Sequence, residues 1–237
     1  MSFLSSLSVL ALASSLLNAS PVAAATSPAA ATTTAASTNA GDAALTADEI
    51  VRRVQAYYDG IRDFSADFSQ EYRSASLGTT RSSSGHVFFK KPGKMRWDYQ
   101  GEDERYLISD GTQLWVYEPG FAQYYNQPLA DSQLPSALRF LMGEGQLADD
   151  FNVRVRSQNR ETIELELVPK VRNSQFSRLR FVVNATTFQV QETTIQDALG
   201  NTNRLVFSSV RQNVGLPDSG FSFSPPAGAR RVEAPAN

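Results

Sequence analysis

The sequence predicts a mainly β fold that curls into a barrel or an open barrel, with helices as a plug. From residue 64 onward, apolar residues recur at every second position in short runs separated by turn residues. Polar and charged residues fill the alternate positions, as in ETIELEL (161–167) and SRLRFVV (177–183). This alternation is typical of antiparallel sheets with one solvated face. Helical periodicity is confined to two short segments.

The dimensions of the predicted elements explain why the sheet should curl. About eleven strands spaced ~4.8 Å apart would form a flat sheet roughly 50 Å wide. Two helices of ~10 Å diameter would cover less than half of it. The apolar face must therefore fold on itself, and it can leave an apolar concavity that is only partly filled. Sheets that enclose a cavity commonly hold a hydrophobic ligand.

The N-terminus has the features of a targeting segment. Residues 3–17 form an apolar core that is too short for a membrane span, and small residues follow it. We expect residues 1–25 to be a signal peptide cleaved after Ala25, with Ala19 and Ala24 as alternative sites. No Lys or Arg precedes the apolar core, so an uncleaved anchor is the alternative.

Two further regions follow the signal peptide. Residues 26–44 are a low-complexity Ala/Thr segment without an apolar face, and we expect a disordered linker. Residues 45–237 then form the folded domain. No apolar run in this part is long enough to span a membrane, so we expect an exported, soluble mature protein.

The first predicted element is an amphipathic helix over residues 47–62. Thr46 and Glu49 fit a capping box, in which each side chain bonds the backbone amide of the other residue. Apolar residues follow at helical spacing, namely Ile50, Val54, Tyr57 and Ile61. The helix should end near residues 60–63.

The period then changes to two, and the Asp110-Gly111 pair marks a hairpin. Pro135 and the apolar face of LPSALRFLMG (134–143) interrupt the strands with a short helix. The tail is expected to be extended at Pro225-Pro226. The predicted strands centre on residues 64–70, 87–91, 95–99, 106–109, 114–117, 122–125, 151–155, 163–167, 179–183, 188–192 and 205–210.

Residue types that carry catalysis are scarce. Cys is absent, His86 is the one histidine, and neither a nucleophile elbow nor a Gly-rich phosphate loop occurs. A single histidine excludes paired-His metal sites, and His86 itself fits an exposed strand position. The acidic run GEDER (101–105) fits a solvated loop better than a catalytic pair. We expect no enzyme activity, no catalytic residues, no metal site and no cofactor.

The stretch GHVFFKKPGKMRWDYQG (85–101) combines large apolar residues with four cations. The chain has a net charge of −2 and no nucleic-acid-binding module, so we expect no nucleic acid partner. Alternation places Lys91 on the Val87 face, where an inward cation needs a partner such as a helix carbonyl end. The other three cations, Lys90, Lys94 and Arg96, should face solvent.

Five stretches in order resemble the LolA family of periplasmic lipoprotein carriers: FSADFSQEY (64–72), GHVFFKKPGKMRWDY (85–99), ISDGTQLWVYEPGFAQ (108–123), LPSALRFLMG (134–143) and FSFSPPAG (221–228). The resemblance implies an incomplete antiparallel β-barrel with an α-helical lid over a hydrophobic cavity. It also implies a periplasmic carrier that takes acylated lipoproteins from an ATP-driven inner-membrane transporter. The carrier passes them to an outer-membrane acceptor of the LolB kind.

The resemblance extends to individual positions. The family has a basic residue before the Pro that locks the lid in the empty state, and Lys91 stands here where other members have Arg. Met95 stands where Phe is frequent. LolB is itself a lipoprotein, and a chain without Cys cannot be acylated in that way, which favours the soluble carrier. We expect this carrier to be a monomer.

We assign nine residues to ligand binding in the cavity or lid, with Lys91 as the lid lock. They are Phe89, Met95, Trp97, Tyr99, Trp115, Tyr117, Leu138, Leu141 and Met142. Two other functions remain open. One is a periplasmic binding protein for another lipid or glycolipid, and the other is a protein-interaction domain with a filled barrel.

Overall fold

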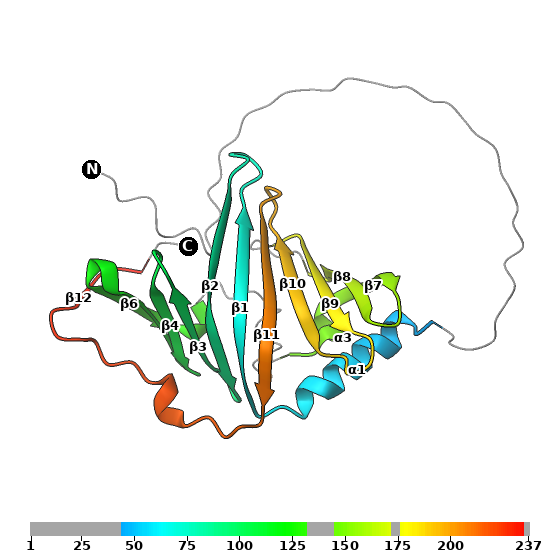
Figure 1. Ribbon diagram of the computed structural model, residues 1–237, viewed down its shortest axis with the longest axis horizontal. Coiled ribbons are helices and arrows are strands. Elements are labelled where there is room, and N and C mark those ends of the chain that lie inside the picture. Colours follow the sequence, from blue (N-terminus) through cyan, green and yellow to red (C-terminus); the bar gives the residue numbers. More distant parts are fainter. Residues whose placement is uncertain (1–43, 132–144, 172–175, 235–237) are drawn as a thin grey trace, which may run out of the picture.

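The computed structural model describes residues 44–131, 145–171 and 176–234 (Figure 1). Its helical elements are α1 (Ala47–Asp59), η1 (Pro119–Phe121), η2 (Leu129–Asp131), α3 (Leu147–Asp150) and η3 (Asp218–Phe221). Its strands are β1 (Asp63–Arg73), β2 (Thr80–Lys90), β3 (Lys94–Gln100), β4 (Arg105–Asp110), β5 (Gln113–Glu118), β6 (Gln123–Pro128), β7 (Phe151–Gln158), β8 (Thr162–Pro169), β9 (Arg178–Asn184), β10 (Val190–Gln196), β11 (Thr202–Gln212) and β12 (Arg230–Arg231).

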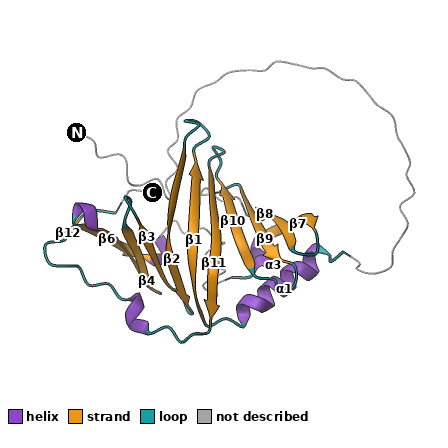
Figure 2. Cartoon of the chain, in the orientation of Figure 1, coloured by secondary structure: helices purple, strands orange, loops and turns teal. Residues whose placement is uncertain are grey.

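All of these strands join one sheet in the order β12-β6-β5-β4-β3-β2-β1-β11-β10-β9-β8-β7. The pairs are antiparallel except for β12, a short strand of the tail that lies parallel to β6. The sheet bends strongly without joining its ends, and β12 and β7 are its outer strands (Figures 1 and 2). The predicted incomplete barrel is confirmed, with β12 in addition to the eleven expected strands. Among the described residues, no helix is long and apolar enough to cross a membrane.

Three predictions concern residues outside the described ranges. The signal peptide (1–25) and nearly all of the linker (26–44) precede the described part of the chain. The short helix predicted over residues 134–143 lies in the gap between β6 and α3.

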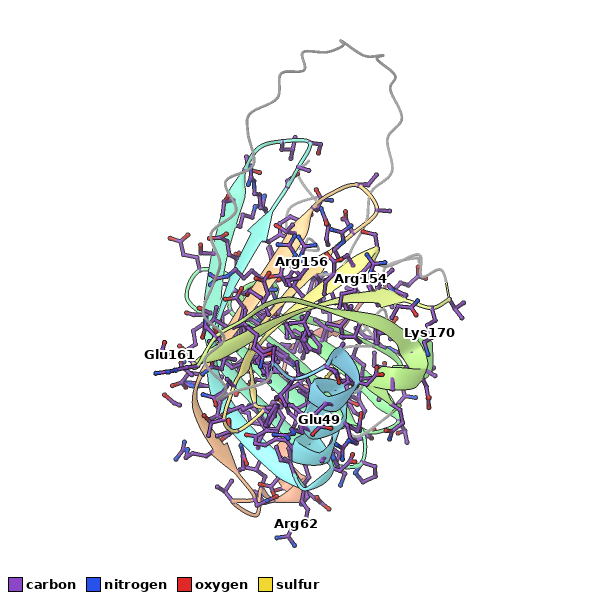
Figure 3. All side chains as sticks on the ribbon, turned by 90° about the vertical axis from the view of Figure 1, so that its right-hand side faces the viewer. Glu49, Arg62, Arg154, Arg156, Glu161 and Lys170 are labelled. Carbon is purple, nitrogen blue, oxygen red and sulfur yellow. The ribbon has the colours of Figure 1, made fainter. Side chains whose placement is uncertain are left out.

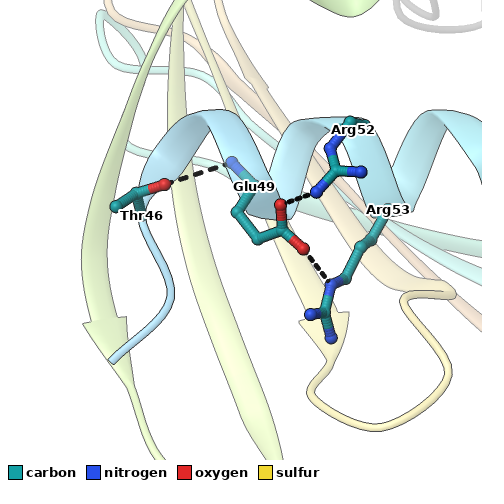
Figure 4. A network of polar contacts seen from close by, with 4 residues as sticks. All are labelled: Thr46, Glu49, Arg52 and Arg53. Atoms are coloured by element: carbon teal, nitrogen blue, oxygen red, sulfur yellow. Dashed lines mark hydrogen bonds and ion pairs between the residues drawn. The ribbon is translucent and has the colours of Figure 1, made fainter. Parts of the chain in front are cut away.

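Helix α1 begins as its capping signal predicts (Figure 4). The Glu49 backbone N–H donates to the Thr46 side-chain oxygen at 3.3 Å. The reciprocal bond expected from Glu49 is replaced, because its carboxylate accepts from Arg53 Nε at 2.6 Å and from Arg52. Arg53 and then Arg52 hold the pKa of Glu49 below its usual value. The helix ends at Asp59, three residues before the predicted end, with Gly60 as its C-cap.

The buried face of α1 packs under the half of the sheet that contains β7 to β10 (Figure 1). The buried residues include Ile50 and Val54, as predicted, but the buried tyrosine is Tyr58 and not Tyr57. The Tyr58 hydroxyl accepts a hydrogen bond from the Val190 backbone N–H at 3.1 Å. Tyr57 is only half-buried, because it lies at the edge of the contact between the helix and the sheet.

The C-terminal segment of the chain runs along the outer face of β3 to β6. It partly covers Lys90, Lys94 and Arg96, so the prediction that these cations face solvent is wrong. Lys90 Nζ donates to the Leu216 carbonyl at 2.6 Å, and Lys90 and Lys94 form ion pairs with Asp218 at 2.6 and 3.0 Å. Arg96 donates to the Gly220 carbonyl at 3.3 Å. These three side chains are partly covered because they hold η3 against the sheet.

Candidate functional site

The inner, concave face of the sheet is apolar on β2 and β3. Phe89, Met95, Trp97 and Tyr99 have exposed fractions of 1, 0, 3 and 4%. Cross-strand register sets their common face, because Phe89 pairs with Met95, and Val87 pairs with Trp97. Strand alternation then places Tyr99 on the same side. The structure therefore brings together these four of the nine predicted ligand-binding residues.

Aromatic rings connect this surface across β1. The Phe64 ring stacks on Phe89 at 4.8 Å between centroids, and the Phe68 ring meets Trp97 edge-on at 4.9 Å. Gly85 makes room for this arrangement, because a Cβ atom there would clash with the Asp98 carbonyl and press on the Phe68 ring at 3.1 Å. The glycine of the GHVFF motif thus lets β2 and β3 approach beneath an aromatic cluster.

Trp115 and Tyr117 lie on the opposite face, which corrects their predicted position in the cavity. The β4–β5 register pairs Ser109 with Leu114, so Leu114 and Val116 take the inner positions and the two aromatic residues point outward. The Tyr117 ring lies 5.7 Å from the ring of Phe223, between centroids. Its apolar surface is covered by the C-terminal segment and does not face the concavity.

Three more predicted binding residues, Leu138, Leu141 and Met142, lie outside the described residues. His86 is exposed on the outer side of β2, as the sequence indicates, with Nδ1 at 2.7 Å from Asp67 Oδ1.

Lys91 contacts a helix end, as its position in the sequence suggests. Its Nζ donates to the carbonyl oxygen of Tyr58 in the last turn of α1 at 2.6 Å. The carbonyl end of a helix carries partial negative charge, so a cation is favourable there. Desolvation lowers the pKa of Lys91, and the charge of Asp59 opposes that effect. Lys91 therefore connects the β2–β3 turn to α1.

An apolar recess lies between the end of α1 and the sheet. It is narrow, with room for about one water molecule. Tyr57, Tyr58 and Ile61 line it on one side, and Phe64, Val190 and Phe207 are among the residues on the other. The recess adjoins the aromatic cluster through Phe64 and Phe207, since the Phe207 ring lies 6.4 Å from Trp97.

A second hollow is polar and lies near the end of the β1–β2 hairpin. Serines and charged residues line most of it, including Ser82, Ser84, Glu71 and Arg204. Apolar side chains are absent from the described residues of its lining, so it does not suit acyl chains.

Sequence reasoning missed Arg105 as a member of the inner face. The loop formed by residues 101–104 is exposed, as expected for the GEDER run, but Arg105 is only 8% exposed. It pairs in register with Tyr99 and therefore stands on the inner side of β4. The signal that could have found it is alternation, because Arg105, Leu107 and Ser109 share one parity.

Comparisons with known proteins agree with this architecture. The family model "Outer membrane lipoprotein carrier protein LolA" matches residues 59–224. An outer-membrane lipoprotein carrier protein of Chromobacterium violaceum is 30% identical over 190 residues, which cover 80% of this chain and 90% of the relative. One from Cupriavidus pinatubonensis is 32% identical over 181 residues, with 75 and 84% coverage.

A solved structure supports the fold alone. An uncharacterised conserved protein from Thermus thermophilus superposes with a TM-score of 0.52 at 12% identity. The superposition covers 78% of this chain and 98% of that protein. Together with the match over residues 59–224 and the relatives of 30% identity and above, the open sheet places this chain in the LolA family of outer membrane lipoprotein carrier proteins.

Proposed function

We propose that this protein is a periplasmic carrier that binds the acyl chains of lipoproteins and delivers them to the outer membrane. The observation that carries the proposal is the apolar inner surface of an unclosed sheet around Phe89, Met95 and Trp97. Membership of the LolA family supports lipoproteins as the source of the chains.

The physical requirement of such a carrier is reversibility. Each CH₂ group removed from water contributes about 0.8 kcal/mol, so several fully enclosed chains would be released too slowly. An open sheet encloses its ligand only in part. Protein groups that occupy the concavity in the ligand-free state must also be displaced. The free energy that this displacement costs weakens the net binding.

Lys91 is proposed as the lock of the empty state. Its bond to the Tyr58 carbonyl joins α1 to the β2–β3 turn, at the margin of the apolar recess. Lys presents a point charge where a guanidinium would present a fork, so a single carbonyl contact suits it. Ligand entry would break this contact. The segment 134–143, with Leu138, Leu141 and Met142, is proposed as the second part of the lid.

The partners and the cellular location follow from the same proposal. Residues 1–25 would direct export and be removed, and residues 26–44 would link the cleavage site to the domain. The donor would be an ATP-driven transporter of the inner membrane, and the acceptor a LolB-like lipoprotein of the outer membrane. The protein would act as a monomer and as a carrier rather than an enzyme.

Co-purification tests the function directly. The protein is isolated from periplasm in which release to the acceptor is blocked, and its ligands are identified by mass spectrometry. We expect acylated lipoproteins. Recovery of glycolipids or other lipids in their place, or of no ligand at all, would contradict lipoprotein transport. If no ligand is recovered, failure of the protein to bind any apolar dye would point to a filled barrel.

A further inference from the structure

Arg105 is a charged side chain inside the apolar face. It is 8% exposed, and its guanidinium carbon lies 3.9 Å from the centroid of the Tyr99 ring. Register and alternation put it on the same side of the sheet as Met95 and Trp97. A cation is therefore held at one end of a surface that is otherwise suited to hydrocarbon.

The guanidinium lacks an anionic partner within the described residues and keeps two unpaired nitrogen atoms. Its Nε and Nη2 atoms have no hydrogen-bond partner, and Arg105 forms no ion pair with any residue in the described ranges. Neighbouring carboxylates are used elsewhere. Glu104 accepts from the Tyr106 hydroxyl at 2.6 Å, and Glu118 on β5 accepts from Gln123 Nε2 at 2.7 Å.

Other arginines of the sheet show the contrast. Arg96 pairs with Asp98 at 2.7 Å, and Arg204 pairs with Glu192 at 2.6 Å, although both arginines are more exposed than Arg105. Burying a cation without an anion is costly, and leaving its N–H donors unsatisfied adds to the cost. The contact with Tyr99 offsets part of this cost but satisfies neither of the two free nitrogen atoms.

We propose that Arg105 binds an oxyanion, a carboxylate or a phosphate, on an acylated ligand whose chains lie along the concave face. This inference rests on the proposed binding of acyl chains by that face and extends it to the polar end of the ligand. A planar guanidinium with two free donors matches the paired oxygens of either group.

The placement also orients the ligand. Lys91 precedes β3 and Arg105 pairs with Tyr99 near the end of that strand, so the two cations mark opposite ends of the inner face. The apolar surface from Met95 to Tyr99 spans about 14 Å along the strand. An acyl chain that starts at Arg105 would therefore run toward the recess beside α1.

The test uses a dansylated undecanoic acid and its methyl ester as fluorescent probes, titrated into the full mature chain near neutral pH. We expect the acid to bind about tenfold more tightly than the ester. In Arg105→Gln this preference should disappear through loss of acid binding, with ester binding unchanged. Arg105→Lys, which keeps the charge, should restore part of the preference.

Arg156→Gln is the matched control, because Arg156 is an exposed arginine on β7, at the far end of the sheet (Figure 3). It should bind both probes as the unchanged protein does. Circular dichroism and the melting temperature show whether each variant is folded. If Arg105→Gln does not fold, the proposal is tested by the ratio of acid affinity to ester affinity, measured for the unchanged protein and for Arg105→Lys.

The outcomes separate this inference from the proposed function. Equal binding of acid and ester by the unchanged protein overturns the role of Arg105 and leaves acyl binding intact. Failure to bind either probe overturns both. Displacement of the bound acid probe by dodecanoate or by dodecyl phosphate identifies which oxyanion the site prefers, and displacement by neither contradicts the proposal.

Discussion

Lys91 Nζ and the carbonyl oxygen of Tyr58 are 2.6 Å apart, so a side-chain hydrogen bond ties the β2–β3 turn to the end of α1. The acceptor belongs to the last turn of the helix, where a cation also interacts favourably with the helix dipole. Both residues border the inner face: Tyr58 lines the apolar recess, and Lys91 follows Phe89 by two positions. This contact is therefore placed to couple helix position to ligand entry.

Replacing Lys91 tests that coupling. In Lys91→Leu the closed arrangement loses a charged hydrogen bond, which contributes roughly 1.5 kcal/mol or more. We expect the apparent affinity for a neutral apolar dye to rise about tenfold, because the open state becomes more populated. Lys90→Leu is the control, since Lys90 points to the outer face and bonds the tail. Unaltered affinity in Lys91→Leu would contradict the lock.

The lowered pKa of Lys91 predicts a pH dependence of stability. Below its folded pKa the partly buried ammonium opposes folding through desolvation. As the pH rises through that pKa toward the ordinary value of 10.5, the unfolded chain holds more protons, so this group's contribution to stability increases. Lys91→Arg stays charged throughout. The free energy of unfolding in urea, measured from neutral to alkaline pH, should rise more for the unchanged protein than for Lys91→Arg. The same pH dependence in both proteins would refute this prediction.

The inner face is tested by placing a charge on it. Met95 is fully buried among Phe89 and Trp97, so Met95→Glu should lower dye affinity and lipoprotein loading at least tenfold in the folded fraction. Trp115→Glu introduces the same group on the outer face and should leave binding intact. Equal binding by both variants would remove Met95 from the site.

The attachment of the C-terminal segment depends on Asp218. Lys90 first, and then Lys94, hold the pKa of this carboxyl below its ordinary value of 3.8. Its favourable contribution is therefore present above that value and lost as the pH falls through the lowered pKa. In Asp218→Asn, we expect limited proteolysis near neutral pH to cut the segment after Gln212 more quickly, and Asp103→Asn should show no change. A cleavage rate equal to that of the unchanged protein would show that other contacts suffice.

Strand alternation predicted most of the sheet correctly because each face of a strand meets one environment. It placed Phe89, Met95, Trp97 and Tyr99 on one side, and their cross-strand register agrees. It also selected Lys91 as the cation with an inward partner. Both results depend on local spacing, which a sequence shows directly.

The errors arose where a distant segment covers a face. Trp115 and Tyr117 are large and apolar, and they were assigned to the cavity for that reason. On the outer face the Tyr117 ring packs against Phe223, a contact between positions about a hundred residues apart that periodicity does not show. Asp218 likewise forms ion pairs with Lys90 and Lys94, which were expected to face solvent. These pairs hold the C-terminal segment against the sheet. Arg105 was missed because it was grouped with the acidic loop before it.

The central pairing of β1 with β11 has a consequence for folding kinetics. Strands β1 to β6 and β7 to β11 each follow one another along the chain, so each half can form from sequence-local hairpins. The seam between them joins distant positions, as in the bond from Gln70 Nε2 to Asn203 Oδ1 across 133 residues. Closing so long a loop costs conformational entropy before the contacts between the two halves can stabilise it. We therefore expect joining of the two halves to be the slow step of refolding, and the hairpins to gain protection from hydrogen exchange earlier.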